Sequence, residues 1–372
     1  MTTASNKNCK ILAAWNDFVA GKSKTEGVRP PVRESWNRCR KNGVNPFDSS
    51  LHPILDGVNL DKLRREKSEL IAVGKPFMAN LYEFVRGSGF VVVLTDESGY
   101  IIEIFADANK WNDPLTGNFF MGASWQEKSA GTNAIGTVAL TKSPLQISGA
   151  EHFCRKHHQL TCSAAPIFNR NKQLIGLLDI SGPSDMAHIH TLGMVVAAAE
   201  AIMAQLDLRI KNKELAFSNN RLTNIFNTIS DGVLIIDNNG LVNEINPVAN
   251  KILKGTGQQI IGTSIERLFG NTPLTRRMLN TRESYEDIEL MVDTRNSTFH
   301  GLASGEPLID DAGNVAGGVI VLRPIMQIKN LINRLSGNNA SLLFDDIIGE
   351  SKEISEAKRL AALTAATSAN IL

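Results

Sequence analysis

The sequence is poor in features that define several classes of protein. Its 372 residues include only four cysteines, and no two of them form a C-x-x-C pair. Sparse cysteines, together with a polar N-terminus that has no apolar leader, predict reduced thiols in a cytoplasmic protein. Uninterrupted apolar runs such as Phe90–Leu94 and Val315–Leu322 are much shorter than the ~20 residues of a membrane-spanning helix. We therefore expect neither a disulfide-rich secreted domain nor contact with a membrane.

An excess of charge of one sign is also missing. The chain has 39 basic and 38 acidic residues, a net charge of +1, which argues against a surface built throughout for nucleic acid. With 42% apolar and 21% charged residues, the composition excludes wholesale disorder, and the length predicts two or three domains. Residues 1–68 are a local exception, with 13 basic against 7 acidic residues. We interpret this excess as a solvated basic face, with an acidic partner or nucleic acid as the alternative.

Signatures of catalysis are missing as well. A phosphate-binding loop needs the sequence G-x-x-x-x-G-K-[ST]. The chain has one Gly-Lys-Ser tripeptide, at residues 21–23, but the position of the first required glycine is occupied by Asn16. Ser163 does not lie in a G-x-S-x-G elbow. Asp96, Asp179 and Asp237 are placed at predicted strand ends, where turn formation explains them. The sequence therefore predicts no catalytic residues and no enzyme activity for this chain.

What is present predicts two α+β domains with antiparallel sheets. An apolar helix over 68–85 precedes the strands Phe90–Asp96 and Tyr100–Phe105, and a second hairpin pairs Cys162–Phe168 with Leu174–Ser181. A second set of strands begins around the turn Asn238-Asn239-Gly240. The predicted divisions are an N-terminal helical segment (1–67), a first domain (68–205), a connector helix (206–228), a second domain (229–324), a second connector helix (325–343) and the start of a further domain (344–372).

The first connector carries an incomplete coiled-coil pattern. Leu208, Leu215, Leu222 and Ile229 recur every seven residues, but the intervening core positions are mostly polar. The pattern fits a helix paired with its copy in a homodimer, and equally a solvent-exposed helix that joins two domains of one chain. The chain ends in the apolar stretch Asn370–Leu372, which predicts that it is part of a longer protein.

Several motifs then point to one family. In the first domain they are Gly122–Glu127, Gly131–Thr137, Glu151–Phe153, Cys162–Ile167 and Leu178–Gly182, and in the second Ile229–Gly232 and Asn246–Asn250. They resemble the GAF and PAS domains of sigma-54-dependent transcription activators of the acetoin-catabolism-regulator type. Residues 344–351 resemble the entry to the AAA+ ATPase domain of that family. The resemblance implies a sensory region truncated at the AAA+ domain; sigma-54 RNA polymerase, ATP and DNA would be bound through domains that this chain lacks.

The resemblance also implies a small, uncharged, oxygenated effector, such as a ketone, a diol or an alcohol like acetoin. We predict no cofactor. A pocket for such a molecule needs apolar walls with a few polar atoms, a mixture found around residues 122–137. The predicted ligand-binding residues are Phe90, Trp111, Trp125, Glu127, Thr132, Asn133, Phe153 and Cys162. For Glu127 and Asn133 the alternative is that they only hold their loop, and Trp111 either caps a cavity or anchors a loop.

Two other functions stay open at this point. Cys154, His157, His158 and Cys162 offer soft ligands for a metal or redox sensor, because a helix would place His158 on one face with both cysteines. They do not form a clean four-ligand set, so we predict no metal site. The other alternative is a ligand-free dimerisation module. If the second domain bound a haem, His300 would be its axial ligand.

Overall fold

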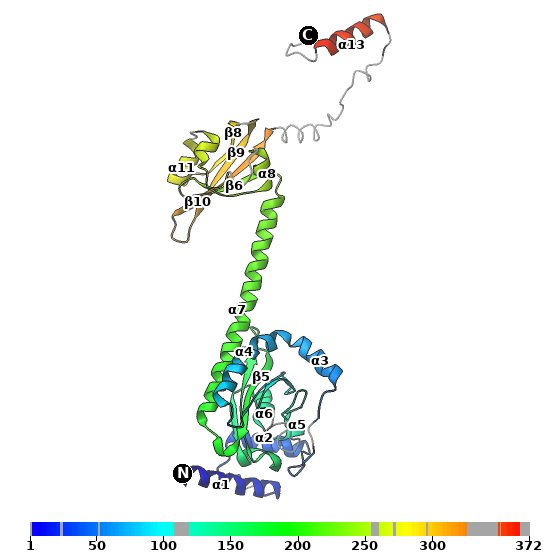
Figure 1. Ribbon diagram of the computed structural model, residues 1–372, viewed down its shortest axis with the longest axis vertical. Coiled ribbons are helices and arrows are strands. Elements are labelled where there is room, and N and C mark those ends of the chain that lie inside the picture. Colours follow the sequence, from blue (N-terminus) through cyan, green and yellow to red (C-terminus); the bar gives the residue numbers. More distant parts are fainter. Residues whose placement is uncertain are drawn as a thin grey trace. The chain divides into compact units, whose positions relative to one another are not determined.

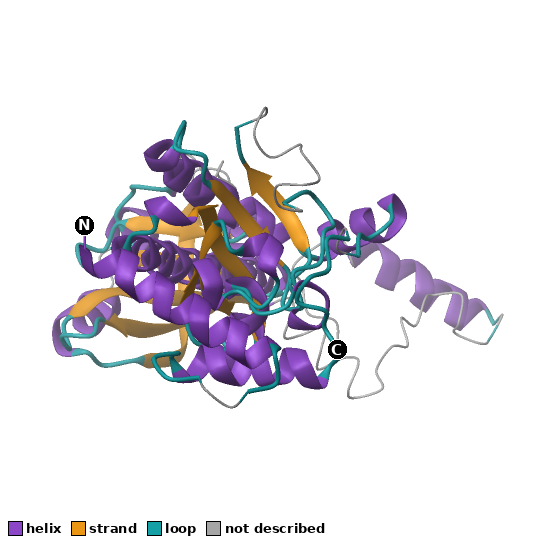
Figure 2. Ribbon diagram, turned by 90° about the horizontal axis from the view of Figure 1, so that it is seen from below, coloured by secondary structure: helices purple, strands orange, loops and turns teal. Residues whose placement is uncertain are grey.

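The computed structural model describes residues 2–22, 25–50, 53–107, 119–253, 260–270, 273–294, 297–325, 349 and 351–364. These residues form two compact units, residues 1–216 and 217–372, which we describe separately (Figure 1). Each unit contains a five-stranded antiparallel sheet together with helices, coloured by type in Figure 2. The predicted α+β class is confirmed.

The sheet of the first unit has the strand order β2-β1-β5-β4-β3, so that β5 lies at its centre. Both predicted hairpins are confirmed, because β1 pairs with β2 and β4 pairs with β5. The strands are β1 (Val91–Thr95), β2 (Ile101–Phe105), β3 (Leu145–Ser148), β4 (Leu160–Phe168) and β5 (Leu174–Pro183). The helices are α1 (Thr2–Val19), α2 (Pro30–Lys41), α3 (Gly57–Glu66), α4 (Ser68–Val85), α5 (Glu127–Ala130), α6 (Ala134–Thr141) and α7 (Ile189–Thr228).

Side chains of each strand alternate between two buried faces of this sheet. On β1, Val92 and Leu94 pack with α4 and α7, and we call this side the α7 face. Val91 and Val93 pack with residues of α1, α2 and α6 and of the 119–125 segment, and we call that side the α2 face. Because both faces are covered, the strands read as continuous apolar runs rather than as alternating patterns.

The N-terminal segment is part of the first unit and not a separate appendage. Helix α2 begins at Pro30, where the missing N–H has no helical partner in any case. Its buried residues recur at helical spacing, so that one stripe of the helix faces the interior of the unit: Val32, Ser35, Trp36 and Cys39. Arg29 and Arg38 form ion pairs with Glu151 and Glu127, at 2.7 and 2.8 Å. Part of the basic excess of residues 1–68 is therefore paired within the chain.

Helix α7 runs for 40 residues and includes the whole stretch 206–228 of the first connector. Its N-terminal part packs on the α7 face through Val195, Ala199 and Ile202. Farther along, Leu208 and Leu215 are 51% and 61% exposed. Among the helices of the described residues, α7 alone is long and apolar enough to cross a membrane, with 33% of its most apolar window buried. Its packing on the sheet accounts for part of that apolar character.

The second unit repeats the arrangement of sheet and helices with the strand order β7-β6-β10-β9-β8. The strands are β6 (Gly232–Asp237), β7 (Val242–Ile245), β8 (Tyr285–Thr294), β9 (Ser297–Ile309) and β10 (Val315–Pro324). The helices are α8 (Pro247–Ile252), α10 (Ile265–Phe269), α11 (Pro273–Thr281) and α13 (Lys352–Thr364). Asn246 caps α8 by accepting a hydrogen bond from the Ala249 N–H. The predicted second connector lies, from residue 326 onward, outside the described residues.

Candidate functional site

Glu127, at the start of α5, is the centre of a buried hydrogen-bond network. Its carboxylate accepts two hydrogen bonds from the Arg38 guanidinium, both at 2.8 Å, and one each from the Ser35 and Thr137 hydroxyls, at 2.5 and 2.8 Å. These hydrogen bonds to Glu127 raise the pKa of Arg38. Thr132 joins the network through a 2.7 Å hydrogen bond to Ser35. The network joins α2 to residues 127–137, which belong to the family motifs described above.

Asn133 has a second set of structural contacts. Its side-chain oxygen accepts the Gly136 N–H at 2.8 Å and so caps α6. Its amide donates to the Trp125 and Gly131 carbonyls, at 2.9 and 2.8 Å. Gly136 lies so close to this loop that a Cβ would stand 2.6 Å from the Trp125 carbonyl oxygen. A side chain at position 136 would therefore collide with the backbone of this loop. The contacts of Asn133 and Glu127 are those of residues that hold the loop in place.

Three of the predicted apolar residues come together on the α2 face. Trp125 is fully buried and stacks on Phe119 at a centroid distance of 4.2 Å. Phe153 and Cys162 are 3% and 1% exposed and belong to the same cluster. Phe90 packs instead on the α7 face, where its ring covers Gly182. Trp111 lies outside the described residues.

Two indoles from the N-terminal helices close this cluster. The Trp15 Nε1–H donates to the Phe153 carbonyl at 2.9 Å, and the Trp36 Nε1–H donates to the Glu151 carbonyl at 2.8 Å. The N-terminal segment thus covers the loop Glu151–Phe153 with two buried aromatic side chains. The sequence showed both tryptophans, but no local pattern could show that they reach residues more than a hundred positions away.

The residues of the alternative metal or redox site do not lie on one face of a helix, as that alternative requires. His158 follows a short 3-10 turn, Arg155–His157, and Cys162 lies in β4, so no helix places His158 between the two cysteines. Within the described parts of the chain, no three His, Cys, Asp or Glu residues are placed to hold a metal ion. Burial raises the pKa of Cys154 to about 12 and that of Cys162 well above its ordinary value. Both thiols are therefore protonated and unreactive at neutral pH.

Asp179 is a functional candidate that the sequence interpretation missed. We interpreted it as a turn residue at a strand end, but it lies inside β5, the central strand, between Val93 and Ala164. It is fully buried, and burial raises the pKa of its carboxyl to about 8. Asp96 and Asp237, by contrast, do accept backbone N–H groups of their turns. The apolar residues on both sides of Asp179 were the available signal, because a turn aspartate rarely has them.

His152 is the second buried polar group near the same cluster. Its Nδ1 lies 3.0 Å from the Gly149 carbonyl oxygen, and burial lowers the pKa of the ring to about 3. Its ring lies 6.0 Å from that of His157, which lies 5.1 Å from Trp125. The α2 face is thus an apolar interior with a few neutral polar groups at its edge.

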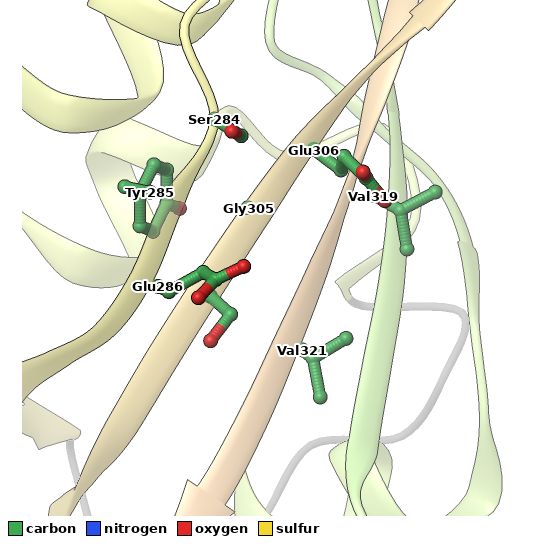
Figure 3. A pocket seen from close by; sticks show the side chains of 8 residues that line it. Ser284, Tyr285, Glu286, Gly305, Glu306, Val319 and Val321 are labelled. Carbon is green, nitrogen blue, oxygen red and sulfur yellow. The ribbon is translucent and has the colours of Figure 1, made fainter.

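Cavities lined by described residues also occur elsewhere. Glu127 borders one of about 320 Å³ with Gln126, Gly136 and Leu140. In the second unit a cavity of about 150 Å³ lies over the sheet, lined by residues that include Tyr285, Ser304 and Val321 (Figure 3).

The haem alternative for the second unit depends on His300. This residue is exposed on β9, and its Nε2 lies 2.6 Å from the Glu289 carboxylate. The neighbouring Phe299 occupies the core instead. Met278 fills the core beneath the sheet, where it would clash with a Cβ built on Gly318. His300 therefore points away from the interior in which a haem would be held.

Comparison with known proteins identifies both domains. Residues 69–206 match the family model of the GAF domain, and residues 220–325 match that of the PAS fold. The chain carries a GAF domain followed by a PAS domain. The first unit is accordingly called the GAF unit, and the second unit is called the PAS unit.

Most of the relatives that the chain matches are named as regulators of transcription or of an operon. A signal-transduction and transcriptional-control protein of Clostridium beijerinckii is 31% identical over 88% of this chain and 51% of that protein. The acetoin dehydrogenase operon transcriptional activator AcoR of Bacillus subtilis is 33% identical over 55% of this chain and 34% of its own length. The chain thus spans about half, or less, of these relatives. The predicted resemblance to acetoin-type activators is confirmed, and the chain is consistent with the sensory region of a sigma-54 activator.

A solved structure shares the fold of both domains. The E. coli DhaR(N)-DhaL complex matches with a TM-score of 0.71 at 19% identity, over 80% of this chain and 100% of that one. At this identity the likeness shows the fold alone. Together with the relatives, it places the chain among the regulatory GAF–PAS sensor regions of acetoin- and glycerol-type operon regulators.

Proposed function

We propose that this chain senses a small, uncharged, oxygenated metabolite in the interior of its GAF unit. The observation that carries the proposal is the α2 face, where Trp125, Phe153 and Cys162 lie together beneath the N-terminal helices. Apolar walls with a few neutral polar groups are what a small ketone, diol or alcohol needs. The buried, protonated thiols favour this function over redox sensing.

The bound effector acts on a regulatory output through helix α7. An effector changes an equilibrium only if it binds one conformation more tightly than the other, and a difference of ~2 kcal/mol corresponds to roughly a thirty-fold bias. Helix α7 begins against the sheet of the GAF unit and ends at the PAS domain, so it can carry such a change. In the intact cytoplasmic activator the signal would reach an AAA+ ATPase module, sigma-54 RNA polymerase and DNA.

We also propose that α7 pairs with its copy in a homodimer. Leu208, Leu215 and Leu222 are more than half exposed and recur every seven residues. Apolar residues at every seventh position supply one of the two rows of core positions in a two-stranded coiled coil. Pairing would cover these side chains, which the chain by itself leaves in water.

The test of the sensor proposal is thermal unfolding of the whole chain with a panel of small ketones, diols and alcohols. A ligand at ~100 times its dissociation constant should stabilise the GAF unit by roughly 2.7 kcal/mol. The variant Trp125→Leu should abolish the shift. The matched control is Phe90→Leu, which changes an equally buried aromatic residue on the opposite face and should keep it. A panel without any shift for the wild type would refute the proposed effector class.

A further inference from the structure

Ion pairs hold helix α7 at the edge of the GAF unit. The turn between β4 and β5 carries Arg170, whose Nε forms an ion pair with Asp207. Its Nη1 lies 3.1 Å from the carboxylate of Glu214, about two turns farther along α7. We call these contacts of Arg170 the α7 clasp. Lys213 Nζ lies 2.7 Å from Glu69, in the first turn of α4, so a second ion pair holds the last turns of α7 that belong to the unit.

The turn that carries Arg170 is fixed by Asn169. Its side-chain Oδ1 accepts the N–H groups of Asn171 and Gln173, at 2.9 and 3.0 Å, and its backbone N–H donates to the Gln173 carbonyl at 3.0 Å. Lys172 completes the turn with a left-handed φ of 57°. Asparagine suits such turns because its side chain bonds the backbone two residues farther on. The guanidinium of the clasp therefore projects from a defined backbone.

Close packing alone does not fix this stretch of α7. A cavity of about 240 Å³ is lined by α7, by the start of α4 and by the β4–β5 hairpin. The apolar residues of its lining are Leu70, Phe168, Ile175, Met203, Leu206 and Ile210. Earlier in α7, Val195, Ala199 and Ile202 are fully buried against the sheet. A close-packed contact allows one arrangement, whereas a void does not, so the ion pairs of Arg170 and Lys213 supply the contacts that packing leaves out here.

The clasp holds the side of α7 that lies away from its exposed leucine row. Ile210, which lines the cavity, is about 160° around the helix axis from Leu208 and about 140° from Leu215, at ~100° per residue. The side chains of Leu208 and Leu215 are correspondingly exposed. The rotation of α7 at the clasp thus determines where this row points.

We propose that Arg170 is a positioning residue that fixes the rotation of α7 about its own axis, and so selects the face that the helix presents to its copy. The inference rests on the proposed homodimer, and it adds the residue through which the GAF unit sets the pairing face. Single exposed ion pairs contribute little, but here one guanidinium joins two carboxylates of the same helix. A shift of the β4–β5 hairpin would move Arg170 and turn α7 with it.

Cysteine cross-linking of the whole chain measures which face of α7 meets the partner helix. The background is Cys9→Ser, because Cys9 is exposed whereas the other three cysteines are buried. Leu222→Cys places a thiol in the leucine row, and Asn220→Cys places one about 160° away around the helix. We expect oxidation to cross-link the chain at least ~10-fold faster with Leu222→Cys than with Asn220→Cys.

Removal of the Arg170 charge should relax this preference. With Arg170→Gln the ratio of the two cross-linking rates should fall at least ~3-fold, whereas Arg170→Lys, which keeps the charge, should restore part of it. Salt at ~1 M should act like Arg170→Gln, because it screens exposed ion pairs. The matched control is Arg86→Gln, which removes another exposed arginine of the GAF unit from its ion pair with Glu83 and should leave the ratio unchanged.

Hydrogen exchange of the backbone amides of residues 207–216 tests the clasp independently of the dimer. Exchange should become at least ~3-fold faster in Arg170→Gln and stay unchanged in Arg86→Gln. Unchanged exchange in Arg170→Gln would overturn the clasp itself.

The cross-linking outcomes separate the two proposals. If the wild-type background cross-links at neither position, the homodimer proposal is wrong, and the role of Arg170 in selecting a pairing face is overturned with it. If Leu222→Cys cross-links and Arg170→Gln leaves the ratio unchanged, the homodimer stands and the positioning role of Arg170 is overturned.

Discussion

Removal of the charge on Glu127 should loosen the N-terminal helices from the GAF unit. The side chain of Glu127 is 2% exposed and binds the Arg38 guanidinium through two hydrogen bonds of 2.8 Å. The substitution Glu127→Gln preserves the shape and an acceptor for the Ser35 and Thr137 hydroxyls. It leaves the Arg38 guanidinium without a carboxylate partner. The loss of this ion pair is the change whose effect on the free energy of unfolding is calculated next.

The magnitude follows from the exposure of the two partners. Breaking a fully buried ion pair by removing one partner costs about 3–5 kcal/mol. The side chain of Arg38 is 34% exposed, so water screens part of its charge. We therefore expect a loss of about 2–3 kcal/mol in the free energy of unfolding of the GAF unit. With a urea dependence of ~3 kcal/mol per M, the midpoint should fall by about 0.7–1 M.

Tryptophan fluorescence during urea unfolding reports the stability of the GAF unit, because all four tryptophans lie within residues 1–216. The control is Glu83→Gln. Glu83 pairs with Arg86 on the surface of α4, where the two side chains are 59% and 60% exposed, and such pairs contribute less than ~1 kcal/mol. If Glu127→Gln shifted the midpoint no further than Glu83→Gln does, the ion pair would not be what holds α2.

Three further predictions concern separate parts of the chain. Relative to Asp179→Asn, the free energy of unfolding of the wild-type GAF unit should fall as the pH rises from about 4 to about 8. The carboxyl of Asp179 is neutral in the folded state, where its pKa is about 8, so its full contribution to stability is present only below the unfolded pKa of ~3.9. A constant difference in urea midpoints across this pH range would contradict a buried neutral acid. Leu215→Glu should convert the dimer to monomer in sedimentation experiments, whereas Asn220→Glu, on the opposite side of α7, should not. Asn133→Ala removes three buried hydrogen bonds and should lower the fluorescence-monitored stability by about 2–3 kcal/mol, whereas Asn246→Ala should leave that transition unchanged and weaken only the PAS unit, as followed by circular dichroism.

Local patterns in the sequence were sufficient to predict the fold class and most of the strands, but not β3 or the helices α5 and α6. The turn residues at Asp96–Gly99 and Asn238–Gly240 set the positions of two hairpins, because they accept backbone conformations that few other residues adopt. The apolar runs between such turns predicted strands that the structure confirms. Pro30 and Asn246 stand at helix starts in the structure, because capping depends on residues within one turn of the helix. All of these signals act over a few residues, which is why a single sequence shows them.

Only the tertiary structure determines which residues lie together in the candidate site. Phe90 and Trp125 are both buried aromatic residues, and only the register of the sheet places them on opposite faces. The partner of Glu127 is Arg38, 89 positions earlier in the chain, and no local pattern shows such a pairing. The apolar neighbours of Asp179 indicate a position inside a strand, but only the pairing of β1 and β4 on either side of β5 buries its carboxyl. Burial and long-range pairing are properties of the packed sheet, and they convert an ordinary aspartate into a neutral donor.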